Sequence, residues 1–431
     1  PPRAFLDAIA SDRAIVLVDD SGHNAWVNSL ALERFGIGSA TPDPEGGAIV
    51  RDANGEPNGL LHETAAKSAF AKTPEPSHPQ YLAAVRKAVE VMNAFGITGM
   101  KDATAIEGSF AAYAELARAG ELSMHTDLAI STVYGRREQP LAADVLEGFE
   151  RARREHQGGE LTLDTVKIYL DGVPTAARTA AMLAPYRPGG GHAEGGTGDL
   201  HVDADVLAAD LVALGSRGFR VKMHVAGDRS VRIALDAIAQ ARAASGRNWP
   251  AHELAHAGYI DDADLPRFAA LGAVADIAPV LWHPSPIIAS VISAVGERGE
   301  HYWPVRALLD SGAMVAAGSD WPSAVPSANP WVGIEALVTR ADPYGQTPGT
   351  LWPEQAVTLE EAVRIYTLNG AKALGREQIT GSIEVGKSAD LIVLDRLLFE
   401  VPVTEVGETQ VLEIWFAGRA VHGKHAAPGA G

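Results

Sequence analysis

Short apolar stretches alternate with amphipathic stretches along the chain between Gly96 and Asp320. The apolar stretches are rich in Val, Ile and Ala, as expected for strands that are buried on both faces. The segments between them carry apolar residues at helical spacing. Such alternation predicts parallel strands joined by helices. The predicted strands are seven: ITGMKDA (97–103), MHTDLAIS (124–131), TVKIYLDG (165–172), RVKMHVAG (220–227), HELAHAG (252–258), AVADIAP (273–279) and MVAAGSD (314–320).

The region before this alternation has mixed character. It begins with a predicted strand at 14–20 and a short helix that ends at Gly36. The segment 48–63 reads as a hairpin, because Asn54–Gly55 suits the positive φ angles of a tight turn. Apolar residues at helical spacing then predict a helix over 78–96.

The region after the alternation contains a predicted helix, LEEAVRIYTLNGAKAL, and two segments with strand character, IEVGKSADLIVLD and VLEIWFAGRAVHG. These strands indicate a small β domain. We therefore expect three parts: a flanking region with a hairpin and a helix, an α/β barrel, and the C-terminal part of a small β domain, spanning 1–95, 96–375 and 376–431.

Four polar residues stand at or just beyond the ends of predicted strands: Lys167, His224, His256 and Asp320. A barrel gathers the C-terminal ends of its strands at one mouth, so these side chains are expected to converge. Imidazole and carboxylate groups bind metal ions. A lysine can do so only after modification, for instance to a carbamate. Taken singly, each residue also has a structural explanation: a hydrogen-bonded histidine, a salt-bridged lysine, or an aspartate that caps a turn.

The chain resembles the amidohydrolase superfamily of metal-dependent hydrolases. The resemblance is carried by SGHNAWVNSLAL, GITGMKDA, VKIYLDG, HVAGDRSV, GSDWPS and GSIEVGKSADLIVLD. These motifs are similar to those of amidohydrolase family 3, the YtcJ-like branch that includes N-substituted formamide deformylases. The resemblance implies a distorted TIM barrel with a small β-sandwich-like domain. It also implies that Lys167, often carbamylated in the superfamily, His224, His256 and Asp320 are the metal ligands.

Two features depart from that family pattern. The first strand of the superfamily barrel carries a His-x-His pair, and no His-x-His occurs in these 431 residues. Seven predicted strands, where a full barrel has eight, agree with this, so we expect that the first strand lies upstream of Pro1. The pattern also has a Glu before the metal-binding His, where this chain has Ala255. His252 is therefore a rival ligand, although its earlier position predicts a site deeper in the strand.

The resemblance implies hydrolysis of a C–N bond in an amide or formamide by a metal-activated water. Asp320 would accept the proton of that water and pass it to the leaving amine. We expect one or two divalent ions, zinc first, with a lysine carbamate at Lys167. Two alternatives stay open: a non-catalytic or truncated homologue with an incomplete metal site, and an esterase or lactonase that uses the same site.

Further polar and aromatic side chains are weaker candidates. Asp228 and Arg229, one turn past His224, are expected either to orient that histidine or to pair at a helix start. Aromatic residues in pocket walls favour apolar or aromatic substrates, although core packing explains them equally well. The candidates of this kind for substrate contact are Trp282, His283 and Trp321. His23 and Asn28, in GHNAWVNS, match the family pattern and are expected either to face the substrate or to have a structural role in a turn.

Composition narrows the range of partners. The formal charge of −18 argues against nucleic acid or an anionic membrane as a partner, since both favour a basic surface. The chain has no cysteine, so thiolate sites and disulfides are excluded. We expect a small-molecule substrate and a cytoplasmic location, although an upstream segment could carry an export signal. A homodimer remains open.

Overall fold

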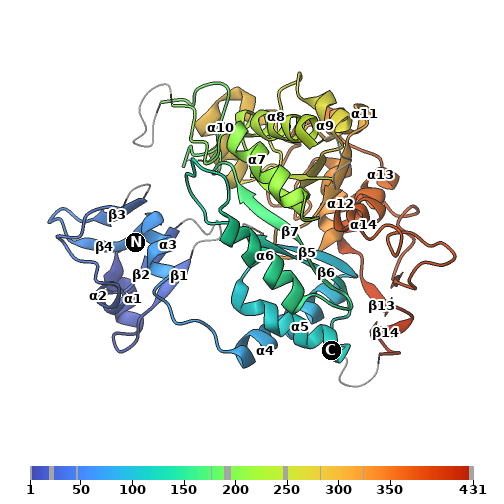
Figure 1. The fold of residues 1–431 in the computed structure, drawn as a ribbon, viewed down its shortest axis with the longest axis horizontal. Helices are drawn as coiled ribbons and strands as arrows, with labels where there is room; N and C mark the ends of the chain where they lie inside the picture. Colours follow the sequence, from blue (N-terminus) through green and yellow to red (C-terminus); the bar gives the residue numbers. More distant parts are fainter. Residues whose placement is uncertain are drawn as a thin grey trace. The chain divides into compact units, whose positions relative to one another are not determined.

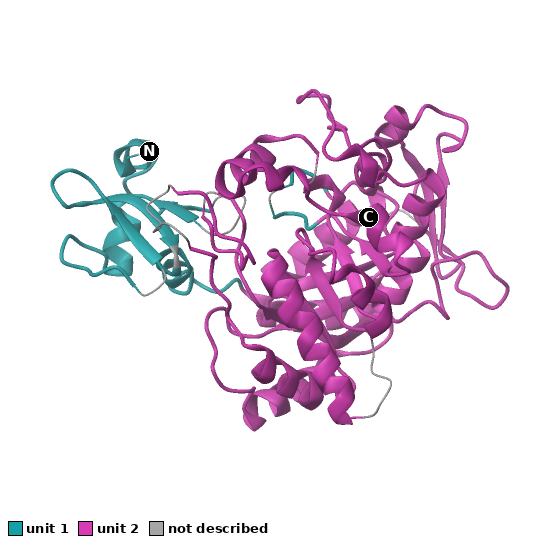
Figure 2. Cartoon of the chain, turned by 90° about the horizontal axis from the view of Figure 1, so that it is seen from above, with its two compact units in different colours: residues 1–76, 320–327 teal, residues 77–319, 328–431 magenta. Residues whose placement is uncertain are grey.

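The structure, a computed structural model, describes residues 2–18, 24–44, 47–175, 177–188, 196–245, 251–281, 283–323 and 325–426. It contains two compact units (Figure 2). Unit 1 comprises Pro1–Pro76 and Asp320–Ser327, and unit 2 comprises Ser77–Ser319 and Ala328–Gly431.

Unit 1 is built on an antiparallel sheet in the order β1-β2-β4-β3. The expected hairpin is present as β3 and β4, with Gly55 at a φ of 83° in the connecting turn. Apolar side chains of the sheet and its helices, including Val27, Leu32 and Leu61, form a core of their own. The elements are α1 (Arg3–Ile9), β1 (Val16–Val18), β2 (Asn24–Val27), α2 (Ser29–Phe35), β3 (Gly47–Arg51), β4 (Pro57–Glu63) and α3 (Thr64–Phe70).

Unit 2 contains a seven-stranded parallel sheet in consecutive order from β5 to β11. Every strand predicted between Gly96 and Asp320 is present, which confirms the distorted TIM-like barrel. The strands are β5 (Gly99–Ala105), β6 (His125–Ser131), β7 (Leu161–Tyr169), β8 (Arg220–Val225), β9 (Glu253–His256), β10 (Val274–Ile277) and β11 (Met314–Ala317).

Helices connect and cover these strands (Figure 1). The α-helices of unit 2 are α4 (His78–Ala94), α5 (Phe110–Ala119), α6 (Ala143–His156), α7 (Ala204–Gly215), α8 (Asp228–Ser245), α9 (Leu265–Leu271), α10 (Pro286–Val295), α11 (Val305–Asp310), α12 (Pro330–Thr339), α13 (Leu359–Tyr366) and α14 (Leu368–Leu374). Short 3-10 turns are η1 (Glu107–Ser109), η2 (Pro279–Leu281), η3 (Glu297–Glu300), η4 (Pro353–Gln355) and η5 (Val403–Glu408).

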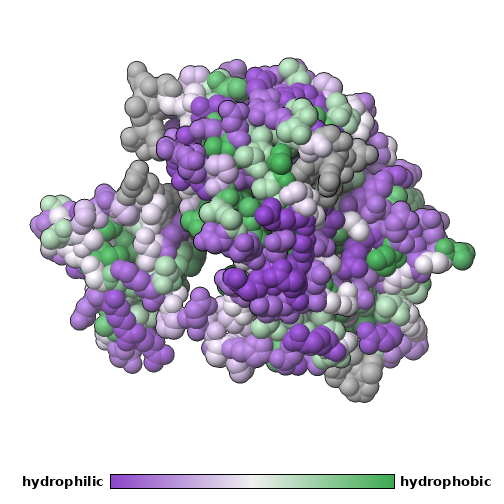
Figure 3. All heavy atoms as spheres, viewed as in Figure 1, coloured by the Kyte–Doolittle hydropathy of each residue, from purple (hydrophilic) through white to green (hydrophobic). Residues whose placement is uncertain are grey.

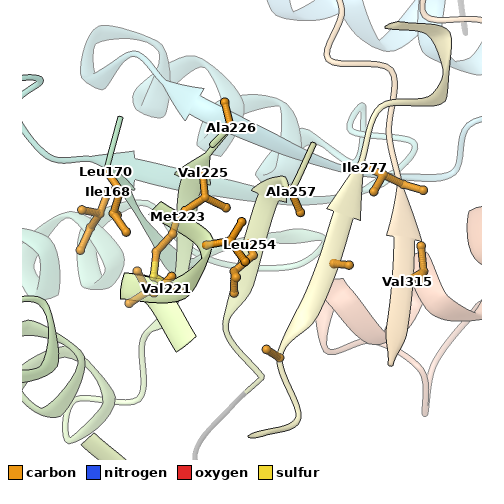
Figure 4. Packing of buried hydrophobic residues seen from close by; sticks show 14 of the residues in the cluster. Ile168, Leu170, Val221, Met223, Val225, Ala226, Leu254, Ala257, Ile277 and Val315 are labelled. Carbon is orange, nitrogen blue, oxygen red and sulfur yellow. The ribbon is translucent and has the colours of Figure 1, made fainter. Parts of the chain in front are cut away.

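Alternation along each barrel strand separates an apolar face from a polar one. On β8, the side chains of Val221, Met223 and Val225 are fully buried in the hydrophobic core (Figure 4). Successive strand residues point to opposite faces, so Lys222 and His224 point the other way, toward the interior of the barrel. The same alternation therefore supplies both the core and the polar interior from which the site is built.

Charged side chains meet in that interior. Lys101 on β5 contacts Glu253 on β9, although three strands separate β5 from β9 in the sheet. Lys222 lies 3.4 Å from Glu253 and also contacts Asp276. Burial opposes the ionisation of Glu253, but the two lysines outweigh burial and lower its pKa to about 2. The contact between β5 and β9 shows that the sheet curves round on itself as a barrel does.

The two edges of the curved sheet, β5 and β11, are both contacted by α14. Two interior side chains of the barrel donate to the end of this helix: Lys101 Nζ to the Ala373 carbonyl at 3.3 Å, and Arg220 Nη2 to the Leu374 carbonyl at 2.8 Å. The C-terminal end of a helix carries partial negative charge, so it suits both cations. The helix thus lies beside the strand position that a closed barrel would fill.

The C-terminal strands form an antiparallel sheet, β12 (Leu391–Leu394), β13 (Val411–Phe416) and β14 (Arg419–His422), which belongs to unit 2. A buried side chain joins it to the barrel: His125 Nε2 on β6 lies 2.8 Å from Asp390 Oδ2, and its ring lies 5.0 Å from that of Phe416.

The surface of unit 2 is strongly hydrophilic over α6, whose arginine and glutamate residues form the purple patch at the centre of Figure 3. Among the described residues, no helix combines the length and the apolar character needed to cross a lipid bilayer.

Candidate functional site

Lys167 lies near the C-terminal end of β7 and is buried, with 3% of its surface exposed. It pairs in register with Lys222 on β8, whose side chain reaches the interior ion pairs, so both lysines point inward. Its Nζ atom lies 5.1 Å from the centre of the Tyr169 ring. A buried ammonium over an aromatic face gains a favourable cation–π interaction.

His224 lies on the inward face of β8, one strand away from Lys167. Its Nε2 atom is 3.0 Å from the Gly172 carbonyl oxygen, which can only accept, so Nε2 carries a proton and donates this bond. Its ring centre lies 5.9 Å from that of Tyr169. The backbone of the loop after β7 therefore orients this imidazole.

His256 ends β9 in a left-handed conformation, with a φ of 72°. Glu253 points inward and Leu254 outward, so a regular strand would turn His256 away from the interior. The positive φ breaks that alternation, and the His256 ring centre lies 4.4 Å from that of His224. Burial, reinforced by His224, Lys167 and Lys222, lowers the pKa of His256 well below its usual value, so the ring is neutral at pH 7.

His252, the rival to His256, lies deeper in the strand. Its Nδ1 atom accepts a hydrogen bond from the Val221 amide at 3.1 Å. Burial lowers its pKa to about 4, with a further contribution from Arg242. Because the Val221 amide occupies the Nδ1 lone pair of His252, and the ring lies deeper in the strand, His256 remains the candidate on this strand.

Asp320 follows β11 and is half-buried, with a φ of 60°. It begins the segment Asp320–Ser327, which belongs to unit 1, whereas Lys167, His224 and His256 belong to unit 2. Trp321, also half-buried, lies in the same segment. The convergence of Asp320 with the other three residues, and the substrate contact of Trp321, therefore stay predictions.

The side chains of His224, His256 and Lys167 supply some, but not all, of the ligands that a metal ion needs. The imidazoles of His224 and His256 lie side by side, and a neutral imidazole such as that of His256 offers a transition-metal ion its lone pair. Within the described residues, however, no three His, Cys, Asp or Glu side chains lie close enough together to hold an ion. Lys167 would supply a third donor only as a carbamate, since an ammonium has no lone pair.

Asn28 has a structural position in unit 1. Its Oδ1 accepts from the amides of Ile15 and Ala31 at 3.0 Å each, and its Nδ2 donates to the carbonyls of Ala10 and Arg13 at 3.0 and 2.9 Å. These bonds use all four hydrogen-bonding positions of the side chain. The structural alternative raised from the sequence therefore accounts for Asn28. Two further substrate candidates, His23 and Trp282, lie outside the described residues.

The remaining candidates contact protein groups near strand ends. His283 Nδ1 lies 3.0 Å from the Pro284 carbonyl and 3.5 Å from Asp342. Asp228 accepts the Leu183 amide at 2.7 Å, and Arg229 Nη2 donates to the Gly198 carbonyl at 2.7 Å. The last two bonds tie the start of α8 to the segment after β7, so they orient that loop instead of the His224 ring.

Asp171, within the motif VKIYLDG, has a role that the sequence pattern does not reveal. It is fully buried, and its carboxylate accepts from the amides of Ala181, Ala226 and Gly227 and from the Ser230 hydroxyl at 2.7–3.0 Å. Burial raises its pKa to about 6 despite these bonds. An Asp-Gly pair directly after a barrel strand was the available signal. Asp171 thus joins the loops that follow β7 and β8.

Comparison with known proteins agrees with this architecture. A protein named as an N-substituted formamide deformylase, from Arthrobacter pascens, is 30% identical over 97% of this chain and 75% of its own length. One named as an amidohydrolase, YtcJ of Bacillus subtilis (strain 168), is 27% identical over 97% of this chain and 76% of its own. The chain thus spans about three quarters of each.

Solved structures share the fold. An uncharacterized metal-dependent hydrolase from Pyrococcus horikoshii OT3 has a TM-score of 0.72 at 24% identity, over 94% of this chain and 75% of that one. A second, from Pyrococcus furiosus, has a TM-score of 0.66 at 23% identity, over 90% and 73%. The sequence model described as "Amidohydrolase family" matches residues 1–422. The chain therefore belongs to the amidohydrolase family and, within it, to the YtcJ-like branch.

Proposed function

We propose that this hydrolase is metal-dependent and cleaves the C–N bond of an amide or formamide at the C-terminal mouth of the barrel in unit 2. The observation that carries the proposal is the adjacent pair of His224 and His256, with ring centres 4.4 Å apart and the buried Lys167 nearby. A buried histidine with a strongly lowered pKa, such as His256 beside a second histidine, is typical of functional sites. The name of the formamide deformylase relative supports the bond type.

His224 and His256 would hold the metal ion, with Lys167 as a third ligand after carbamylation. In that step the neutral Nζ amine adds to the carbon of CO2 and loses a proton, which leaves one negative charge on the new carbamate. A bound metal ion would supply Lewis acidity to water and to a carbonyl oxygen. Zinc is the first choice, since imidazole nitrogen and carboxylate-like oxygen are its usual ligands.

Asp320 would act as the proton carrier of the reaction. It would take the proton of the attacking water and deliver it to the nitrogen of the leaving amine. Tyr169 supplies aromatic surface beside Lys167 and His224, and its ring lies 5.2 Å from that of Tyr134. Aromatic walls suit a substrate with an apolar or aromatic group.

A second candidate is a non-catalytic homologue that folds without turnover. It is favoured by the lack, among the described residues, of three acidic, histidine or cysteine side chains that could share an ion. The two candidates differ in metal content and in activity, so one set of measurements separates them.

The test combines metal analysis with a panel of amides, formamides, esters and lactones. We expect about one or two zinc ions per chain and turnover of the C–N substrates. Lys167→Ala should lower the metal content, because the carbamate is lost, and short carboxylic acids should partly restore it. His224→Ala should also lower the metal content, but short carboxylic acids should not restore it.

Matched controls are Lys87→Ala and His78→Ala, whose side chains are 65% and 46% exposed on α4. Both should retain metal and activity. If the metal-loaded protein hydrolyses none of the substrates, the chain is the non-catalytic homologue. If it hydrolyses esters but no amide or formamide, the reaction is C–O hydrolysis and the proposed C–N hydrolysis is wrong.

A further inference from the structure

Trp303 bonds to the left-handed backbone at the end of β9, which the Ala257 amide also ties to the Val225 carbonyl at 2.9 Å. His256 and Ala257 have φ angles of 72° and 41°. Non-glycine residues in this region carry about 1–3 kcal/mol of strain each and persist where their surroundings hold them. Trp303 provides two such contacts: its indole Nε1 donates to the His256 carbonyl at 2.8 Å, and its backbone amide donates to the Gly258 carbonyl at 2.8 Å.

Trp303 is itself firmly fixed. Its side chain is 2% exposed, and its ring centre lies 3.6 Å from that of Tyr302. The buried guanidinium of Arg340 donates to the Tyr302 carbonyl at 2.9 Å and lies 3.5 Å from the Trp303 carbonyl. Tyr302 also fills the space beside Gly258, where a Cβ atom would lie 2.0 Å from its ring. The indole is therefore a rigid donor.

We infer that Trp303 is a positioning residue for His256. The indole N–H donates a hydrogen bond to the His256 carbonyl and so stabilises the positive φ of His256. That φ interrupts the regular alternation of the strand and directs the imidazole toward His224. Without this bond, the strain favours an extended backbone at His256, which would direct the ring away from the barrel interior. The inference rests on the proposed function in one respect: it makes Trp303 a determinant of metal affinity at the His224–His256 pair.

The first test is Trp303→Phe, which removes the indole N–H and keeps an aromatic ring. With Zn²⁺ alone as the probe, calorimetric titration should show affinity lower by about 10- to 100-fold, the usual effect of losing a group that orients a ligand. The matched control is Trp331→Phe. Trp331 is also buried, and its Nε1 has no hydrogen-bond partner within the described part of the chain, so its replacement should leave the affinity unchanged.

A double-mutant cycle separates positioning from general loss of structure. In a His256→Ala background, Trp303→Phe should change Zn²⁺ affinity by less than about twofold, because the group on which it acts is gone. An equal loss in both backgrounds, or parental affinity in the single variant, overturns the inference.

A measurement without metal keeps the inference distinct from the proposed function. In crystal structures of the metal-free parent and Trp303→Phe proteins, His256 should keep its positive φ in the parent and return to an extended φ in the variant. If the parent protein binds no Zn²⁺, the proposed function fails, while this comparison still decides the role of Trp303. A His256 that keeps its left-handed conformation in the variant would overturn it.

Discussion

At the scale of single residues, the chemistry depends on what burial does to groups that are ordinarily charged or solvated. His256 is kept neutral by burial and by neighbouring cations, whereas Asp171 is held by four donors although burial disfavours its charge. A neutral imidazole is ready to bind an ion, because protonation would remove its lone pair. Burial thus keeps His256 available as a ligand, whereas the four donors fix Asp171 between two loops.

Asp320 gives the sharpest prediction at this scale. Asp320→Asn removes the group that accepts a proton from water, so kcat should fall by about 10²–10⁴-fold with the fold intact. Steady-state kinetics on a formamide or amide substrate, together with circular dichroism, would measure this. Asp12→Asn is the matched control, since the Asp12 side chain is 75% exposed in unit 1. Near-normal turnover by the Asp320 variant would remove the general-base role.

The sequence alone could place Lys167, His224 and His256 because each lies at a strand end, where strand order dictates position. It could not reveal the positive φ of His256 or its bond from Trp303, which joins residues 47 positions apart. The role of Asp171 was missed for the same reason, since its donors come from two different loops. Local sequence patterns predict the position of a residue on its strand, whereas contacts between distant segments decide the direction of its side chain.

At the scale of elements, the barrel strands were predictable because buried parallel strands are short apolar runs between helices. Their bounds differ by a few residues: β7 begins at Leu161, earlier than expected, because its first residues pair with β6. The packing of α14 against both β5 and β11 was not predictable. It depends on the curvature of the whole sheet, which no local pattern encodes.

The link between the barrel and the C-terminal sheet gives a prediction of pH dependence. Burial opposes the charge on Asp390, yet hydrogen bonds from His125, Ala417 and Ser388 lower its pKa to about 2. A carboxyl with a lowered folded-state pKa stabilises the fold above its ordinary pKa, near 3.8, and this contribution is lost as pH falls toward 2. Asp390→Asn should therefore cost about 2 kcal/mol at pH 7.

Urea unfolding at several pH values would measure that cost. The difference between the parent and Asp390→Asn should shrink steadily below pH 4. The exposed aspartate variant Asp12→Asn should show no such difference at any pH. A cost for Asp390→Asn that stays constant down to pH 2 would mean that the carboxylate charge does not hold the sheet to the barrel.

At the scale of the whole molecule, the described residues form two hydrophobic cores. One comprises residues of unit 1, including Leu61, and the other comprises residues of unit 2, including Leu254. The sequence patterns predicted a mixed first region and a barrel. They did not indicate that 320–327 belongs with unit 1, because membership in a unit depends on contacts and not on local periodicity.

Separate cores predict separate unfolding. Leu61 and Leu254 are both fully buried, so replacing either by alanine should destabilise its own unit by about 2–5 kcal/mol. Scanning calorimetry should resolve two transitions, since cooperativity belongs to each core. Leu61→Ala should lower the midpoint of one, and Leu254→Ala that of the other. Leu412→Ala, at a side chain 51% exposed, should shift neither. A single transition that both buried variants lower together would show instead that the two units unfold as one cooperative body.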